Sequence, residues 1–487
     1  MSKRPLPSGL LLLAALALPA DAAVPGRLAG KLAACELPGV PAGGLCGTFE
    51  VAEDRGATNG RTIALRVVVL PATGPDVAPD PLVFLAGGGV APATSYAAFL
   101  AHDYALLRRH RDVLLVDQRG TGASNPLACD IDTASASPSY RDPARFTAAV
   151  RRCRDEVSRH ADLRYYTTPQ AMADLEEVRG WLSYPRLNLY GVSYGSQAAM
   201  EYERLHPDRA RAMVLHGVLP LDESVWLDVP RNGQDGVDRM LAACASHPAC
   251  HGAFPRLAAE LPELLHRLAE KPATIDANPA PGAGKTTVRI DEEVVRDFIS
   301  RSLYGADRIH DLPLLLHLAH AGDYDVLAQR LAVKADTSIP RGIYYTLVCS
   351  EETHFDPAAL PGEAAGKVLG VLRVSRDLLA CRDWPRGELP ASYFTPLHSS
   401  VPALVMNGAL DHVTPPRYGE RVMRTLTNAR RLVLPLRGHN DTDACVASIV
   451  TAFVEAGEAQ KVDASCLDQT PPLSFATKPA ELTRNED

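Results

Sequence analysis

A serine flanked by small residues gives the clearest chemical signal in this sequence. Residues 191–195 read Gly-Val-Ser-Tyr-Gly, between an apolar run at 186–190 that predicts a strand and a predicted helix at 196–202. A sharp turn between strand and helix exposes the serine Oγ at the head of the helix, where the peptide dipoles favour developing negative charge. The pattern therefore predicts that Ser193 is a nucleophile and that the backbone N–H of Tyr194 helps to stabilise an oxyanion.

A serine hydroxyl becomes a strong nucleophile only when a base removes its proton and an acid orients that base. The segment at 401–411 predicts a buried strand that ends at Asp411, and the apolar run at 431–436 is followed by His439. Taken singly, Asp411 is also compatible with a turn residue and His439 with a surface loop. An acid after one strand and a histidine after the next favour a triad with Ser193.

Three nearby residues compete for the acid and base roles. His412 adjoins Asp411, so its side chain points elsewhere if Asp411 faces the site. Asp441 and Asp443 follow the histidine so closely that we interpret them as caps of a helix at 443–450.

A run of glycines precedes the serine in the chain and supplies a further candidate. The apolar segment at 81–85 predicts a strand, and Gly87, Gly88 and Gly89 follow it. Glycines here let backbone N–H groups approach a substrate carbonyl, so we predict Gly89 as the other half of an oxyanion hole with Tyr194. A flexible turn is the alternative interpretation.

Three passages resemble one family of enzymes. The segment 117–124, Asp-Gln-Arg-Gly-Thr-Gly-Ala-Ser, resembles the D-Q-R-G-x-G-x-S signature of proline-iminopeptidase-like α/β-hydrolases, and 188–195 is similar to their serine turn. The segment 401–439 resembles the C-terminal region of secreted tripeptidyl aminopeptidases. This family usually has a proline in the glycine loop, which is absent here, so the geometry of that loop is less well fixed.

The resemblance implies an α/β-hydrolase fold, with a mostly parallel central sheet flanked by helices and an inserted helical cap. The pattern along the chain agrees, because strand-like and helical runs alternate up to about residue 219 and resume near residue 402. The intervening residues favour helices, such as 257–268 and 292–303, around a Pro/Gly/Ala loop at 277–284. We expect four parts: a signal peptide at 1–22, the first part of the core at 23–220, the cap at 221–396, and the C-terminal part of the core at 397–487.

The start of the chain and its cysteines indicate export. Lys3 and Arg4 precede an apolar run at 10–18 and a small-x-small site at 20–22, as in secretory signal peptides. We expect a secreted or periplasmic protein without a stable membrane anchor, and the net charge of −8 argues against nucleic acid as a partner. Spacing alone does not determine disulfide connectivity. The simplest pairing of the ten cysteines joins sequence neighbours: Cys35–Cys46, Cys129–Cys153, Cys244–Cys250, Cys349–Cys381 and Cys445–Cys466.

The predicted cap contains a candidate specificity residue. Similar secreted peptidases have an acidic residue shortly after a cysteine that corresponds to Cys349, and this implies that Glu351 binds the free α-ammonium group of a peptide. Two solvated surface glutamates, Glu351 and Glu352, are the alternative.

The sequence as a whole predicts a secreted serine exopeptidase of the tripeptidyl- or prolyl-aminopeptidase type, acting on peptides through an acyl-enzyme. No metal or organic cofactor is implied. An esterase with the same triad is the nearest alternative, since acyl-transfer residues do not identify the leaving group, and a non-catalytic binding protein is a more distant one. The sequence leaves open how many residues are released and whether proline is preferred.

Overall fold

The computed structural model describes residues 25–278, 284–332 and 339–483. The expected signal peptide lies outside these residues, as does most of the Pro/Gly/Ala loop. Among the described residues, no helix has both the length and the apolar character needed to cross a bilayer.

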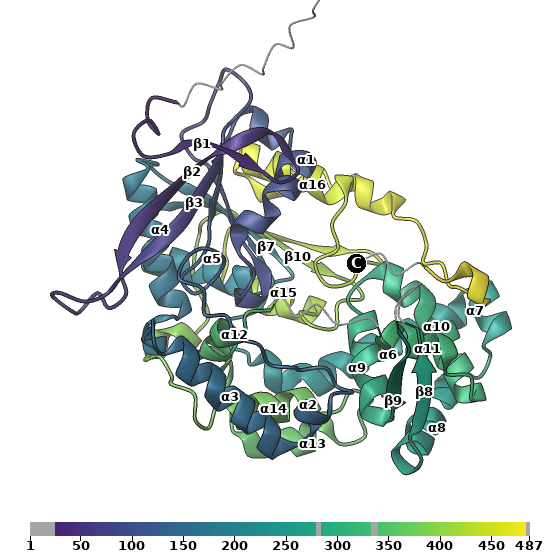
Figure 1. The fold of residues 1–487 in the computed structure, drawn as a ribbon. Coiled ribbons are helices and arrows are strands. Elements are labelled where there is room, and N and C mark those ends of the chain that lie inside the picture. The colour runs from purple at the N-terminus through teal and green to yellow at the C-terminus, as the bar shows by residue number, and fades with distance from the viewer. Residues whose placement is uncertain (1–24, 279–283, 333–338, 484–487) are drawn as a thin grey trace, which may run out of the picture.

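A nine-stranded sheet forms the centre of the molecule (Figure 1). Its strands are β1 (Ala33–Leu37), β2 (Val40–Ala52), β3 (Thr62–Leu70), β4 (Leu82–Leu85), β5 (Val113–Val116), β6 (Leu187–Val192), β7 (Ala210–His216), β10 (Ala403–Gly408) and β11 (Ala429–Leu434). Their order across the sheet is β1-β2-β3-β5-β4-β6-β7-β10-β11. β1 pairs antiparallel with β2, β2 with β3, and β3 with β5. The six strands β5, β4, β6, β7, β10 and β11, which follow one another in this order across the sheet, run parallel.

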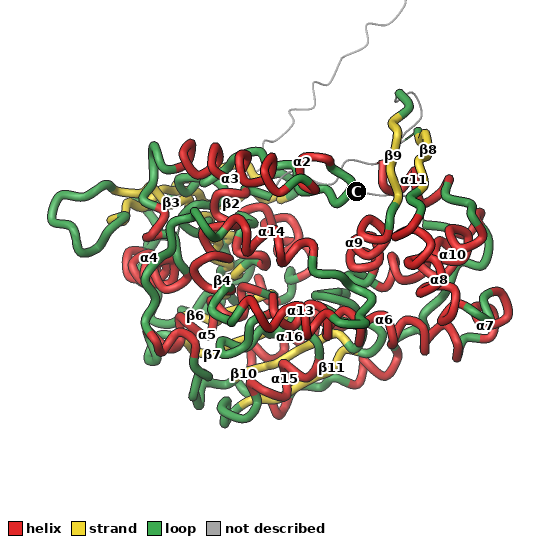
Figure 2. The backbone as a smooth tube through the Cα atoms, turned by 90° about the horizontal axis from the view of Figure 1, so that it is seen from below, coloured by secondary structure: helices red, strands yellow, loops and turns green. Residues whose placement is uncertain are grey.

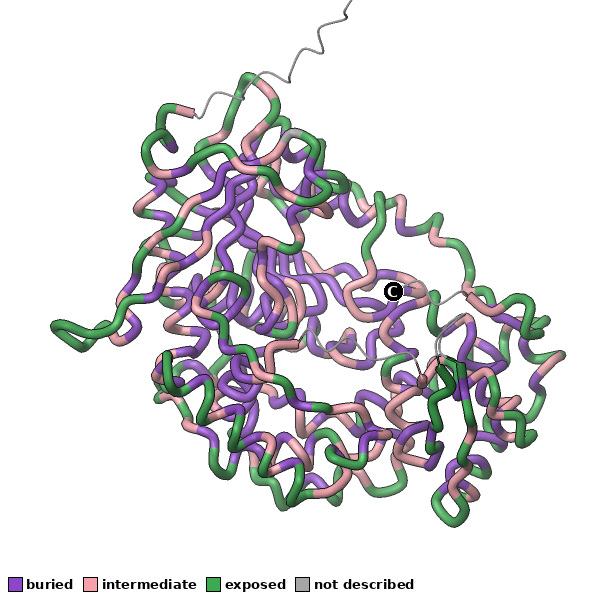
Figure 3. The backbone as a smooth tube through the Cα atoms, in the orientation of Figure 1, coloured by how far each residue is buried: buried purple, intermediate pink, exposed green. Residues whose placement is uncertain are grey.

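Helices cover both faces of this sheet, which explains why β4 and β5 are buried along their whole length. The helices of the core are α1 (Ala97–Asp103), α2 (Pro138–Arg141), α3 (Pro143–Val157), α4 (Thr168–Trp181), α5 (Tyr194–Leu205), α15 (Pro416–Val422) and α16 (Ala444–Ala456). Residues of β3 alternate between two apolar cores, with Val67 and Val69 packing toward α4 and α5, and Val68 and Leu70 toward α1 and α16. In Figure 3 the strands of the sheet form the buried interior.

A mainly helical segment separates β7 from β10 in the sequence. It contains α6 (Val225–Ser246), α7 (Pro248–Ala253), α8 (Leu257–Glu270), α9 (Glu292–Ser302), α10 (Ala306–Ala321), α11 (Asp325–Ala332), α12 (Arg341–Leu347), α13 (Leu360–Ala364) and α14 (Leu372–Ala380). Helices α6 to α11 share an apolar core of their own with residues of the C-terminal tail, including Phe475. We propose that this segment is the cap.

The sequence predicted a helical segment, but the segment also contains two strands. Strands β8 (Ala273–Ala277) and β9 (Thr286–Ile290) form an antiparallel hairpin at the edge of the molecule (Figure 2). Their exposed and less exposed residues alternate, with Val288 and Ile290 buried, which is the period of a half-buried strand. The expected loop at 277–284 starts at the end of β8 and therefore lies within this hairpin.

All ten cysteines form disulfides, and the pairs are the five neighbouring pairs expected from the sequence. Cys349–Cys381 joins the segment after α12 to the end of α14, and Cys445–Cys466 ties α16 to the C-terminal tail. Five such bonds are typical of proteins from oxidising compartments.

Candidate active site

Ser193 lies on a strained turn between β6 and α5. Its backbone has φ of 55° and ψ of −123°, a conformation that non-glycine residues rarely adopt. The neighbouring glycines are required by close approach, because a Cβ on Gly191 would lie 2.1 Å from the Gly195 carbonyl oxygen. A Cβ on Gly195 would lie 2.0 Å from the carbonyl oxygen of Leu85. The expected turn, with the serine at the start of a helix, is therefore present.

The structure brings the three predicted triad residues together. His439 Nε2 lies 3.0 Å from Ser193 Oγ, and His439 Nδ1 lies 2.9 Å from Asp411 Oδ2. The residues follow β6, β10 and β11, whose carboxyl ends meet at one edge of the sheet. In this arrangement the imidazole can accept the serine proton while the carboxylate fixes its tautomer.

Asp411 is buried and surrounded by hydrogen-bond donors. Its carboxylate accepts from the backbone N–H groups of Val413 and Thr414, both at 2.8 Å, and from Thr414 Oγ1 at 2.7 Å. Burial alone would raise the pKa of Asp411, but His439 and Thr414 hold it well below its usual range. The acid is thus kept ionised. Sequence reasoning missed Thr414, although a hydroxyl three residues after the acid was the available signal.

The competing residues occupy other roles. His412 faces Ser300, with 3.5 Å between Nε2 and Oγ, and burial lowers its pKa to about 4. Asp443 caps α16 by accepting from the Val446 N–H at 2.9 Å, as expected. Asp441 is not a cap of that helix, because it accepts from the Gly438 N–H at 2.7 Å and so holds the loop that bears the candidate base.

A second histidine, missed in the sequence, lies behind the nucleophile. His216 ends β7, its carbonyl accepts from the Ser193 N–H at 2.8 Å, and its ring stacks on Tyr190. Burial, with a smaller contribution from the nearby His439, lowers the pKa of His216 to about 4. His216 is therefore neutral at physiological pH and adds no charge beside the candidate base.

The glycine loop lies against the serine turn. Gly87–Gly89 forms a single 3₁₀ turn, in which φ is +70° at Gly88 and +65° at Gly89. A Cβ on Gly87 would lie 3.3 Å from the Ser193 Cβ, so this loop borders the nucleophile. The role of Gly89 as an oxyanion donor remains a prediction.

A buried network connects Tyr194 with Glu351. The hydroxyl groups of Tyr194 and Thr168 are hydrogen-bonded, and Thr168 donates to Glu351 through its N–H at 2.6 Å and its Oγ1 at 2.7 Å. Tyr393 donates to the same carboxylate at 2.7 Å. The phenol ring that follows the nucleophile is thus fixed by residues from α4 and from the segment after α12.

Glu351 and Glu352 are both buried, so the alternative of two solvated surface glutamates is wrong. Burial raises the pKa of Glu351, against the hydrogen bonds from Thr168 and Tyr393. Burial and the neighbouring Glu351 raise the pKa of Glu352 to about 8. Within the described part of the chain, Glu352 Oε2 has no hydrogen-bond partner. When it is ionised, a buried carboxylate with an oxygen that lacks a donor gains a partner by binding a cation.

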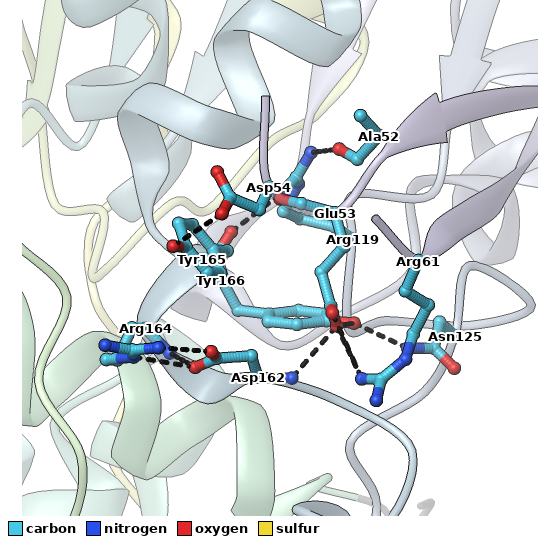
Figure 4. A network of polar contacts seen from close by, with 10 residues as sticks. All are labelled: Ala52, Glu53, Asp54, Arg61, Arg119, Asn125, Asp162, Arg164, Tyr165 and Tyr166. Atoms are coloured by element: carbon cyan, nitrogen blue, oxygen red, sulfur yellow. Dashed lines mark hydrogen bonds and ion pairs between the residues drawn. The ribbon is translucent and has the colours of Figure 1, made fainter. Parts of the chain in front are cut away.

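The segment that resembles D-Q-R-G-x-G-x-S fixes the elements next to this site. Arg119 is fully buried and donates to the backbone oxygens of Ala52, Glu53 and Tyr165 (Figure 4), and also pairs with Asp174 of α4 through two contacts of 2.6 Å. It thereby ties the end of β2 to the helix whose first turn carries the threonine of the Glu351 network.

Asp117, in the same segment, holds the region after the glycine loop. It accepts from Thr94 N at 2.9 Å, from Thr94 Oγ1 at 3.0 Å and from Ala123 N at 3.2 Å. Among the described residues, no group of three or more His, Cys, Asp or Glu side chains is arranged to hold a metal ion.

Comparison with known proteins agrees with this geometry. Residues 80–443 match the family model described as alpha/beta hydrolase fold. The chain belongs to the alpha/beta hydrolase family. Family membership confirms the fold class expected from the sequence and the resemblance on which it was based.

The curated relatives of this alpha/beta hydrolase include peptidases. Serine protease Hip1 of Mycobacterium tuberculosis is 28% identical over 242 residues, 46% of each chain. The tripeptidyl aminopeptidase of Streptomyces lividans is 28% identical over 37% of this chain and 36% of its own length. The proline iminopeptidase of Neisseria meningitidis is 28% identical over 33% of this chain and 39% of its own. The chain thus spans less than half the length of these relatives.

Solved structures also have some similarity to this chain, at lower sequence identity. The proline iminopeptidase of Mycobacterium smegmatis is 16% identical, covers 84% of this chain and 98% of its own, and has a TM-score of 0.40. The family match and the distant curated relatives together make the chain a serine-peptidase-like alpha/beta hydrolase.

Proposed function

We propose that this protein is a serine exopeptidase that hydrolyses peptide bonds near free N-termini. The observation that carries the proposal is the hydrogen-bonded Ser193, His439 and Asp411 triad beside a buried acidic pair, one oxygen of which has no partner among the described residues. The triad carries out acyl transfer. The acidic pair, Glu351 and Glu352, favours substrates that have a free ammonium group.

The catalytic cycle follows from the distances in the triad. Ser193 Oγ attacks the carbonyl carbon of the scissile bond as its proton passes to His439 Nε2. The negative charge then rests on the former carbonyl oxygen, near the N–H of Tyr194 and the loop that contains Gly89. When the carbon–nitrogen bond breaks, His439 gives its proton to the leaving amine and an acyl-enzyme remains. Water attacks this ester, gives a proton to His439 and releases the acid, with the serine proton restored.

Tyr194, the residue after Ser193, connects the acidic pair with the reacting serine. Both carboxylates act electrostatically on the Tyr194 phenol and raise its pKa together with burial, which is the larger cause. In addition, Leu347 at the end of α12 packs on the glycine loop, since a Cβ on Gly89 would lie 2.4 Å from its Cδ1. The segment that bears the two glutamates therefore covers the predicted oxyanion region.

The two glutamates have different roles in this proposal. Glu352 Oε2 accepts a hydrogen bond directly from the substrate ammonium. Glu351, whose oxygens already accept from Thr168 and Tyr393, adds negative charge and fixes the position of Tyr194. An internal segment of a longer peptide has no ammonium group and would leave Glu352 without a partner, so the enzyme would discriminate against it.

Export is part of the same proposal. Five disulfides support folding in an oxidising compartment, and the sequence signals at residues 3–22 support secretion or a periplasmic location.

The direct test compares matched substrates that differ only in the charge of the N-terminus. Aminoacyl- to tripeptidyl-anilides with a free amine should be cleaved at least tenfold faster, in kcat/KM, than their N-acetylated forms, because losing one member of a desolvated charge pair costs about 2–5 kcal/mol. Short-chain esters serve as the comparison for general acyl hydrolysis. Equal cleavage of free and acetylated peptides, or turnover of esters alone, would refute the exopeptidase proposal and favour an endopeptidase or an esterase.

A further inference from the structure

Arg373 presents a positive charge on the helical segment that covers the sheet. It lies near the start of α14, and its side chain is exposed to solvent. The guanidinium carbon lies 5.3 Å from the centre of the Trp226 ring and 5.9 Å from that of Tyr344, and Nη2 donates to the Tyr344 hydroxyl at 3.3 Å. Two aromatic rings and a hydrogen bond thus hold the group in a defined position.

Among the described residues, no carboxylate oxygen lies within 4.0 Å of this guanidinium, and Asp377 acts on it electrostatically without a direct ion pair. Asp377, one turn later on α14, accepts instead from the Tyr344 hydroxyl at 2.9 Å. Arg376 on the same helix is used differently, because it donates to the backbone oxygens of Tyr140 and Arg141. Arg376 therefore connects α14 to the residues of α2, whereas Arg373 has donors that no group in the described part of the chain uses.

Residues that contact Arg373 are adjacent in sequence to residues that contact Glu352. The guanidinium lies over the ring of Trp226. The residue before it is Val225, whose backbone N–H lowers the pKa of Glu352 by hydrogen bonding. Ser224, one residue earlier, donates from Oγ to the backbone oxygen of Glu352 at 2.9 Å.

Tyr304 connects the surroundings of Arg373 with the triad. Tyr304 packs edge-on to His439, with 5.5 Å between ring centres, and its carbonyl accepts from the His439 N–H at 2.8 Å. Tyr344 is the largest cause that raises the pKa of Arg373; burial opposes it, and Tyr304 and Asp377 raise the pKa further. Arg373 thus contacts Trp226, which follows the neighbours of Glu352, and is within electrostatic range of Tyr304, which packs against the candidate base.

We propose that Arg373 binds a carboxylate of the substrate, so that the enzyme recognises peptides with a positive and a negative end. This inference rests on the proposed exopeptidase function. A guanidinium that stacks on rings through its face keeps its edge free, and the edge can bind a carboxylate through two hydrogen bonds. The carboxylate is either the C-terminus of a short peptide or an acidic side chain, and both have the same chemistry.

The test measures a charge ratio in the mature, disulfide-bonded protein. Short free-amine peptides are compared as C-terminal acids and C-terminal amides, and a second pair exchanges glutamate for glutamine in the leaving part. The wild type should prefer the acid member of at least one pair by roughly tenfold or more in kcat/KM, mainly through KM. The preferred pair identifies the source of the carboxylate. Equal rates for both members of both pairs would overturn the inference.

Variants separate this role from a structural one. Arg373→Met should bring the acid-to-amide ratio close to one, and Arg373→Lys should keep part of the preference, because a lysine retains the charge but not the two-bond geometry. Arg382→Met removes the same charge from an exposed position shortly after α14 and should leave the ratio unchanged. A ratio that survives Arg373→Met, or falls equally in Arg382→Met, would contradict direct binding.

A further substrate pair keeps the inference testable if peptides are not cleaved. Aryl esters that carry either a carboxylate or a carboxamide on the leaving group measure the same ratio without a peptide bond. Cleavage of these esters but of no peptide would refute the exopeptidase proposal, while the ester ratio in the wild type and Arg373→Met would still decide whether Arg373 binds a carboxylate.

Discussion

The pKa of Glu352 makes the proposed ammonium site dependent on pH in a way that can be calculated. Only an ionised Glu352 attracts an ammonium group, and its pKa of about 8 means that most molecules of the free enzyme carry a protonated Glu352 at pH 6. The α-amine of a peptide has a pKa of about 8 and is charged below it. The productive combination, an ionised carboxylate with a protonated amine, is therefore most populated near pH 8.

The expected size of the effect follows from these two values. Between pH 8 and pH 6 the population of the productive combination falls roughly 25-fold, from about one quarter to about one hundredth. Titration of the triad itself is removed by dividing kcat/KM for a free-amine peptide by kcat/KM for an acetyl ester measured at the same pH. This quotient should fall roughly 25-fold on acidification from pH 8 to pH 6 in the wild type.

Glu352→Gln is the matched control, because it keeps the shape of the side chain and removes its titration. In this variant the quotient should be lower at pH 8, and its fall below pH 8 should disappear. A wild-type quotient that stays flat between pH 6 and pH 8, or an equally steep fall in Glu352→Gln, would refute the assignment of the ammonium site to Glu352.

Three further predictions concern the triad, the supporting network and the disulfides. Asp411→Asn should lower kcat roughly 10⁴-fold in a folded protein with unchanged circular dichroism, and a loss below tenfold would remove Asp411 from the triad. Arg119→Met should lower the free energy of unfolding in urea by about 3–5 kcal/mol, because Asp174 keeps only the partly exposed Arg55 as its ion-pair partner and three backbone oxygens lose their donor; a change below 1 kcal/mol would contradict this. The mature protein should show no free thiols when titrated in denaturant, and two or more per chain would exclude the five pairs.

The triad could be predicted from the sequence because each of its residues follows a short apolar strand. The runs that became β6, β10 and β11 are local patterns, and parallel strands place their carboxyl ends at one edge of a sheet. The five disulfides were predictable for a related reason, since the partners are at most 32 residues apart. The hairpin β8–β9 was missed because its strands are only five residues long and interrupt a helical pattern.

The surroundings of Glu351 could not be predicted, because its partners are distant in the sequence. Thr168 is 183 residues away and Tyr393 is 42, and neither belongs to a local pattern that includes the glutamate. Whether a glutamate is buried depends on the packing of several elements, so sequence alone could not distinguish Glu351 and Glu352 from solvated residues. The different roles that we propose for them depend on which oxygens already have donors.

Covalent labelling of Ser193 tests the central claim most directly. A fluorophosphonate probe reacts with a serine only when a base activates it, so the wild type should gain one adduct per chain, located by peptide mapping at Ser193. Ser193→Ala should gain none while it keeps the fold and the disulfides of the wild type. Labelling of a folded Ser193→Ala protein, or an adduct at another residue in the wild type, would contradict the account.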